Sequence, residues 1–139
     1  MDATLQAVVA AFQHAGSSRW DSAARAEGRC AVASFEFDLQ LTQAGLAVPH
    51  YVFEFWSGDD AGAENHYANV IGRSDAVVVV DWTARQFGTD IAGMAPEYPH
   101  VRSMTEYLDD FAWHGMRVAP QSELSNGAAA SFQVTDGVG

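Results

Sequence analysis

The sequence predicts an α+β domain in which helices pack on a small antiparallel β-sheet. Apolar residues recur at helical spacing near the start, a stretch free of proline and glycine covers 30–44, and two β-rich runs flank a short polar segment. The length of 139 residues suits one hydrophobic core. We therefore expect one domain over residues 1–119, followed by a segment, 120–139, that is either disordered or an edge strand.

The first predicted element is a helix over residues 2–15. Its apolar residues follow the i, i+3, i+4, i+7 spacing, and they are Leu5, Val8, Val9 and Phe12. Asp2 precedes them as a cap, and Gly16 follows as a stop. Residues 16–29 are small and polar, so we expect a loop or a short, broken helix there.

The second predicted helix begins at Cys30 and ends at Ala44, ahead of Gly45, which favours a helix end. Alternation of Phe35, Phe37 and later leucines is also compatible with a strand. The absence of a breaker over this length favours the helix.

The rest of the chain predicts strands and one more helix. Residues 48–56 are aromatic-rich and indicate a strand, and the runs 66–72 and 76–82 indicate a hairpin. Residues 83–100 have no clear pattern. The last predicted helix covers 104–114, with Gly115 behind it.

The charge balance excludes two classes of partner. Asp and Glu number 18 against 7 basic residues, which gives a formal net charge of −11. Nucleic acids and anionic membranes are held mainly by Lys and Arg, so neither is an expected partner. The sequence has no apolar run of transmembrane length and no signal-peptide pattern, which predicts a cytoplasmic location.

Metal and cofactor sites are not predicted. Cys30 is the single cysteine, which excludes an internal disulfide and a four-cysteine zinc site. His50 and Glu54 suggest zinc ligands, but on a strand this spacing separates them by about 13 Å. The acidic pair Asp109 and Asp110 is expected on a solvated helix face.

Cys30 is the candidate nucleophile. At the start of a helix, free backbone N–H groups and the positive end of the helix dipole stabilise a thiolate. A neighbouring imidazolium strengthens that effect. His66 is the candidate for this imidazolium, and it lies just before the first strand of the predicted hairpin.

The hairpin also supplies a candidate third residue. A turn centred between Arg73 and Ser74 would place His66 directly opposite Asp81, where their side chains could hydrogen-bond. Asp81 would then fix the tautomer of His66 and stabilise its charged form. The predicted site is thus a Cys-His-Asp triad of Cys30, His66 and Asp81.

Three segments together resemble the papain-like and transglutaminase-like superfamily of cysteine enzymes: GRCAVASFEFDLQLTQAG, NHYANVIG and VVVVDWTARQF. Its members include compact bacterial papain-fold glutamine deamidases of toxins and effectors, cysteine proteases, transglutaminases and arylamine N-acetyltransferases. The Asp-x-Thr-x-x-Gln-Phe string that begins at Asp81 is similar to that of the compact bacterial members. The resemblance covers about residues 28–88.

This resemblance implies a papain-like core, with the nucleophile helix packed on the sheet, and no cofactor. It implies attack of Cys30 on a carboxamide or peptide carbonyl of a protein or peptide substrate, with glutamine deamidation as the leading version. A cysteine protease and a catalytically inactive module that binds a partner protein are the alternatives. The glutamine that papain-like proteases carry shortly before the cysteine is absent, since no glutamine lies between Gln13 and Cys30. The Cys30 backbone N–H is thus one expected oxyanion donor, and the second is unassigned.

Three further residues are expected to line the site. Arg29 is a cation beside the nucleophile, and Gln86 follows the strand that carries Asp81. Trp82 could shield a hydrogen bond of the triad from water, as could Trp56.

Overall fold

The computed structural model describes residues 2–16, 19–58, 65–73, 76–87 and 96–119. The helices are α1 (Ala3–Gly16), α2 (Ala23–Ala26), α3 (Cys30–Gln43) and α4 (Met104–Phe111), with a 3-10 turn η1 (Ala84–Phe87). The strands are β1 (His50–Trp56), β2 (His66–Ile71), β3 (Val78–Asp81), β4 (His100–Ser103) and β5 (Gly115–Val118). The predicted α+β class is therefore confirmed. The predicted C-terminal segment, 120–139, lies outside the described residues.

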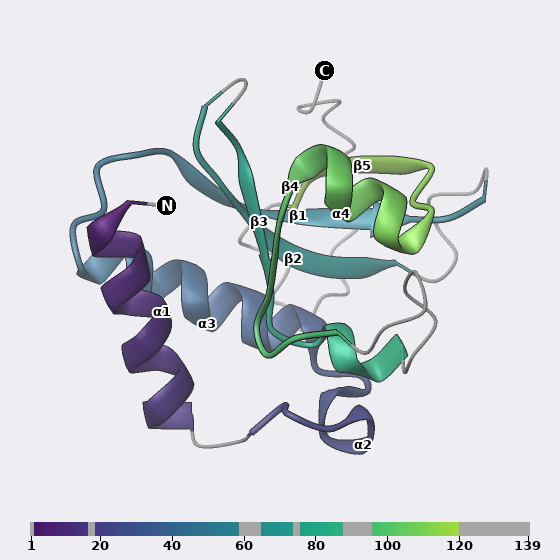
Figure 1. Cartoon of the computed structure of the whole chain (residues 1–139), viewed down its shortest axis with the longest axis horizontal. Coiled ribbons are helices and arrows are strands. Elements are labelled where there is room, and N and C mark those ends of the chain that lie inside the picture. The colour runs from purple at the N-terminus through teal and green to yellow at the C-terminus, as the bar shows by residue number, and fades with distance from the viewer. Residues whose placement is uncertain (1, 17–18, 59–64, 74–75, 88–95, 120–139) are drawn as a thin grey trace.

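The five strands form one antiparallel sheet in the order β4-β3-β2-β1-β5. In Figure 1, α1 and α3 lie together below the sheet, and α4 lies above it. The two faces have separate cores. One contains Phe37, Ile71 and Val80 under α3, and the other contains Phe55 and Tyr107 under α4.

The first helix forms as its sequence predicts. The Asp2 carboxylate accepts a hydrogen bond from the Leu5 amide at 3.0 Å, which satisfies one free N–H of the first turn. Leu5 and Phe12 are buried, and the Phe12 ring packs on Phe37 of α3 and on Trp82. The amphipathic pattern therefore places α1 against α3.

The helix that begins at Cys30, α3, also follows its prediction. It starts at Cys30, and its end is closed by hydrogen bonds from Gly45 N to Thr42 O and from Leu46 N to Leu41 O. Gly45 has a φ of 73°, the left-handed conformation that this type of helix end requires.

The hairpin is present, but its predicted register is wrong. Val70 pairs with Val79, and Asn69 pairs with Val80, so His66 and Asp81 lie two positions away from direct opposition. The turn closes one residue later than expected, with a hydrogen bond of 2.8 Å from Ala76 N to Arg73 O. A shift of two positions keeps both residues on the same face of the sheet, because side chains alternate with a period of two.

The structure adds two strands that the sequence does not predict, β4 and β5, both at sheet edges. The last helix, α4, ends at Phe111, earlier than expected, because Ala112 adopts a left-handed φ of 54°. A hydrogen bond of 3.0 Å from Trp113 N to Leu108 O follows. These two changes turn the chain back so that β5 pairs with β1.

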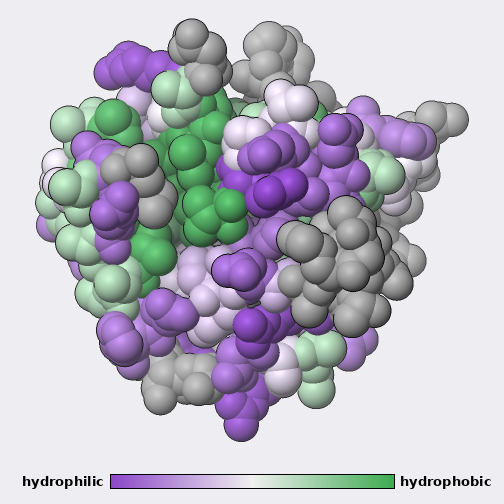
Figure 2. All heavy atoms as spheres, in the orientation of Figure 1, coloured by the Kyte–Doolittle hydropathy of each residue, from purple (hydrophilic) through white to green (hydrophobic). Residues whose placement is uncertain are grey.

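Helix α4 is amphipathic and is tied down by ionic contacts. Figure 2 shows hydrophilic side chains over α4 and apolar side chains beside it, over β3 and β4. The prediction that Asp109 and Asp110 both lie on a solvated helix face is wrong for Asp110. Its carboxylate accepts hydrogen bonds from Arg102 at 2.7 Å and 3.0 Å and lies 3.0 Å from His100 Nε2. Asp110 thereby attaches α4 to β4.

Candidate active site

Cys30 is the first residue of α3, and its side chain is partly exposed. A hydrogen bond of 3.0 Å from Ala33 N to Arg29 O opens the helical ladder. The amide groups before Ala33 therefore have no partner within the helix. Together with the helix dipole, they create a positive potential at the Cys30 side chain.

His66 and Asp81 form a buried pair. His66 Nε2 lies 2.7 Å from Asp81 Oδ2, and the two side chains are 4% and 0% exposed. They are diagonal neighbours on adjacent strands, a separation of about 7 to 8 Å that two side chains can bridge. The contact expected from the sequence is therefore made, although the register that predicted it is wrong.

The Cys30 side chain hydrogen-bonds to the His66 ring and interacts with its charge. Because Nε2 of His66 already bonds Asp81, the sulfur is assigned to Nδ1, which the Gln86 amide nitrogen also approaches. The structure thus brings together the three predicted triad residues, which come from α3, β2 and β3.

The electrostatics of this arrangement favour a charged imidazole. Burial is the largest influence on His66 and lowers its pKa, but the Asp81 carboxylate opposes it by charge and hydrogen bonding, with a smaller contribution from Cys30. The net result raises the pKa of His66 to about 10. His66 is therefore an imidazolium at neutral pH. For Asp81, burial raises the pKa, but His66, Tyr107 and Thr83 together hold it below its usual value.

Two further donors hold the Asp81 carboxylate. The Thr83 amide donates to Oδ1 at 2.9 Å, and the Tyr107 hydroxyl donates to Oδ2 at 2.5 Å. Burial, followed by the Asp81 charge, raises the pKa of Tyr107 well above its usual value, so its hydroxyl stays protonated. The carboxylate is therefore fixed from both oxygens.

Aromatic rings cover the His66 imidazole. Trp113 stacks on it with centroids 5.8 Å apart and an interplanar angle of 13°, and Phe87 contacts it edge-on at 4.8 Å. These rings, rather than Trp82 and Trp56, shield the pair. Trp113 follows α4 and is remote from the predicted motif in sequence, so no local pattern indicated it.

The three residues expected to line the site have different positions. Gln86 joins it, since Gln86 Nε2 lies 3.3 Å from His66 Nδ1. Arg29 is exposed at the cap position of α3. Trp82 instead points into the core on the α3 face, where it packs against Phe12 and Phe37, because consecutive strand residues face opposite sides.

Asn69 links the helix of Cys30 to the strand of His66. Its side chain is fully buried and donates a hydrogen bond of 2.8 Å to the Ser34 carbonyl oxygen of α3. A buried amide of this kind fixes the helix along its length. Nothing in the local sequence distinguishes Asn69 from an ordinary residue of the ladder.

His50 and Glu54, considered above as zinc ligands, have separate partners. His50 Nδ1 lies 2.7 Å from Asp38 Oδ1 of α3. Glu54 accepts a hydrogen bond from Arg117 at 2.8 Å and another from Asn65. Among the described residues, no group of three or more His, Cys, Asp or Glu side chains could hold a metal ion.

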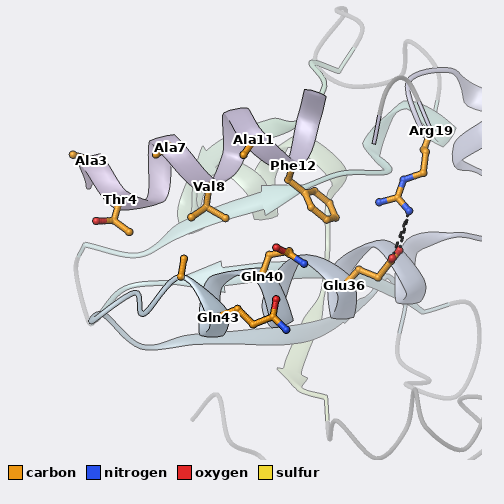
Figure 3. Close-up of a pocket in the computed structure, with 11 residues that line it drawn as sticks. Ala3, Thr4, Ala7, Val8, Ala11, Phe12, Arg19, Glu36, Gln40 and Gln43 are labelled. Atoms are coloured by element: carbon orange, nitrogen blue, oxygen red, sulfur yellow. Dashed lines mark hydrogen bonds and ion pairs between the residues drawn. The ribbon is translucent and has the colours of Figure 1, made fainter. Parts of the chain in front are cut away.

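A pocket lies away from the triad, on the α1–α3 side of the molecule. It has a volume of about 870 Å³ and follows the groove between α1 and α3, with Val8 and Phe12 on one wall and Gln40 on the other (Figure 3). The Arg19–Glu36 ion pair closes one end. None of Cys30, His66 and Asp81 lines this groove, so it is separate from the candidate site.

A smaller pocket of about 530 Å³ lies beside His66. Its lining includes Gln86, Phe87 and Trp113, each of which contacts the imidazole ring. Ser57 and Phe111 extend it away from the ring. The pocket is therefore separated from the imidazole by the side chains that contact it.

Comparison with family models, with curated proteins and with solved structures finds no match to this chain. Within the described ranges, no helix is long and apolar enough to cross a lipid bilayer.

Proposed function

We propose that this chain is a cysteine-dependent amide hydrolase that acts through a thioester, and that its leading reaction is deamidation of glutamine in a protein target. The observation that carries the proposal is the continuous hydrogen-bonded series from Cys30 to His66 to Asp81. The resemblance of residues 28–88 to papain-like and transglutaminase-like enzymes supplies the reaction class.

In the first half of the proposed reaction, the Cys30 thiolate attacks the carbon of the side-chain amide. The negative charge that develops on the amide oxygen is met by the Cys30 backbone N–H, which has no partner within α3. His66 gives its Nδ1 proton to the nitrogen, the C–N bond breaks, and ammonia leaves. A thioester between Cys30 and the substrate remains.

In the second half, His66 is neutral and acts as the general base. It accepts a proton from water as the water oxygen attacks the thioester carbon. The C–S bond then breaks, which releases glutamate on the target and restores the thiolate and imidazolium. If an amine replaces water, the same thioester gives a transamidated product.

The charge of the chain bears on the choice of target. A formal net charge of −11 favours encounter with a protein whose surface is basic and disfavours acidic ones. The pocket beside His66 contains Ser57 and Gln86 among aromatic rings, together with Asp110, whose charge is paired with Arg102. This lining suits a neutral, polar carboxamide next to an apolar neighbour.

The first experiment measures alkylation of Cys30 by iodoacetamide between pH 5 and pH 9, followed by intact mass. The unsubstituted protein is compared with His66→Ala and with His14→Ala, a matched control on the exposed side of α1. We expect fast alkylation well below pH 8 in the unsubstituted protein and in His14→Ala, and slow alkylation in His66→Ala. Equal rates in all three proteins would refute the Cys30–His66 pair.

A second experiment identifies the reaction. Basic and acidic protein substrates are incubated with the chain, and released ammonia and peptide masses are measured, with Cys30→Ser as the inactive control. Ammonia release without backbone cleavage supports deamidation, whereas new termini in the substrate indicate a cysteine protease. A reactive Cys30 without either product would favour a module that binds a partner protein.

A further inference from the structure

Tyr107 contacts the triad at Asp81. It lies on α4, its side chain is fully buried, and its hydroxyl donates to Asp81 Oδ2 at 2.5 Å. The same oxygen lies 2.7 Å from His66 Nε2. Tyr107 and His66 therefore share one acceptor atom.

We propose that Tyr107 is a positioning residue whose hydroxyl keeps Asp81 ionised and limits the pull of that carboxylate on the His66 imidazolium. The inference rests on the proposed function, because it concerns how readily His66 releases its Nδ1 proton to a leaving group. Tyr107 itself neither touches the substrate nor transfers a proton.

The sign of the effect follows from competition for one oxygen. Each donor to Oδ2 draws on the same negative charge, so a hydrogen bond from Tyr107 weakens the one from His66. Without the hydroxyl, Asp81 becomes a stronger base and holds the imidazolium more tightly. His66 is then a poorer acid toward the leaving ammonia, although its place in the site is unchanged.

The surrounding groups leave this role to Tyr107. The charged groups that interact with His66 are Asp81 from β3 and Cys30 from α3. His100 of β4 is the strand partner of Asp81 in β3. Its side chain contacts other groups, since Nε2 lies 3.0 Å from Asp110 and Nδ1 accepts a hydrogen bond from the Glu97 amide. Tyr107 is thus the side chain of α4 that acts on the Asp81 carboxylate.

The ring and the hydroxyl of Tyr107 make different contacts, so a substitution can remove one set and keep the other. The ring makes edge-on contacts with Phe55 and Phe111, with centroids 5.0 Å apart in each case. The helix is held independently by the Ser103–Glu106 capping box. Tyr107→Phe therefore removes the hydrogen bond and keeps these aromatic contacts.

The test measures the titration of His66 directly by NMR of ¹⁵N-histidine-labelled protein. In Tyr107→Phe, the midpoint for loss of the His66 ring proton is expected to move up by about 0.5 to 1 pH unit. With 3-fluorotyrosine at position 107, whose hydroxyl is a stronger donor, the midpoint is expected to move down. Tyr98→Phe, which removes a phenol hydroxyl from the other core, is the control and should leave it unchanged.

The opposite signs of the two changes distinguish this role from packing. An unchanged midpoint, or shifts in the same direction for both substitutions, would overturn the proposal. Should Tyr107→Phe fail to fold, the fluorotyrosine protein gives the answer alone. The proposed function has a separate readout, since alkylation of Cys30 that is independent of His66 would refute it whatever Tyr107 does to the titration.

Discussion

His66 and Asp81 are hydrogen-bonded at 2.7 Å although the strand register does not place them opposite each other. Their positions differ from direct opposition by two residues, and a shift of two retains the face on which both side chains lie. A register shift of one residue would instead have turned the Asp81 side chain to the other face of the sheet, into the core under α3 where Trp82 lies. The hydrogen bond therefore depends on the register shift being an even number of residues, which keeps both side chains on one face of the sheet.

Replacement of Asp81 by Asn should abolish the stabilisation of the imidazolium while preserving the volume of the side chain. The charge of Asp81 is the leading influence that raises the pKa of His66, so its loss lets burial favour neutral imidazole. We expect alkylation of Cys30 at pH 6 to slow by at least about tenfold. Asp109→Asn, at an exposed position of α4, is the control and should react like the unsubstituted protein.

The stability of the fold should fall as pH rises from about 6.5 to about 10. Over this range folded His66 keeps its proton and unfolded His66 loses it, so the unfolded state binds fewer protons and is favoured by rising pH. Denaturant unfolding of Cys30→Ser measures the effect without thiol titration, and the loss should be a few kcal/mol. The additional change Asp81→Asn should remove most of this pH dependence. A flat profile in Cys30→Ser would show that His66 is not held as an imidazolium.

Much of the fold could be predicted because its signals are local. The Asp2 cap, the stop at Gly45 and the apolar spacing of α1 act within a few residues and define helices directly. The strands β4 and β5 could not be predicted in this way. Each spans four residues and pairs with one strand only, so its formation depends on β3 or β1 being in place.

The candidate site likewise contains residues with local sequence signals and residues that only tertiary contacts bring there. A predicted helix start indicated Cys30, and a predicted hairpin indicated His66 and Asp81. These three residues could therefore be predicted from the sequence. Tyr107 and Trp113 reach the site because α4 packs on the sheet, a tertiary contact without a local pattern. The prediction that Trp82 lines the site was wrong for a similar reason. Trp82 follows Asp81 directly, so its side chain points to the opposite face of the sheet.

Asn69 should matter for both stability and reactivity. Asn69→Ala removes the hydrogen bond to the Ser34 carbonyl and is expected to cost about 1 to 3 kcal/mol of unfolding free energy. Because that bond holds α3 on β2, alkylation of Cys30 should slow as well. Val79→Ala truncates a buried side chain on the opposite face and serves as a control for stability loss alone. Equal alkylation rates in these two variants would contradict a positioning role for Asn69.

Gly115 should tolerate no side chain, because Trp56 occupies the space. A Cβ at Gly115 would lie 2.4 Å from atoms of the Trp56 ring, which is closer than any van der Waals contact. The ring cannot simply move away, since Arg117 lies over it at 5.2 Å and Trp56 pairs directly with Gly115 across β1 and β5. Gly115→Ala is therefore expected to destabilise the fold by about 1 to 3 kcal/mol through overpacking.

A double-mutant cycle tests that cause for Gly115→Ala. In a Trp56→Leu background the smaller side chain leaves room for the added methyl group, so the same substitution should cost much less. Denaturant unfolding of the four proteins gives the coupling between the two positions. If Gly115→Ala costs the same in both backgrounds, the loss comes from the backbone at Gly115 and the contact with Trp56 is not its source.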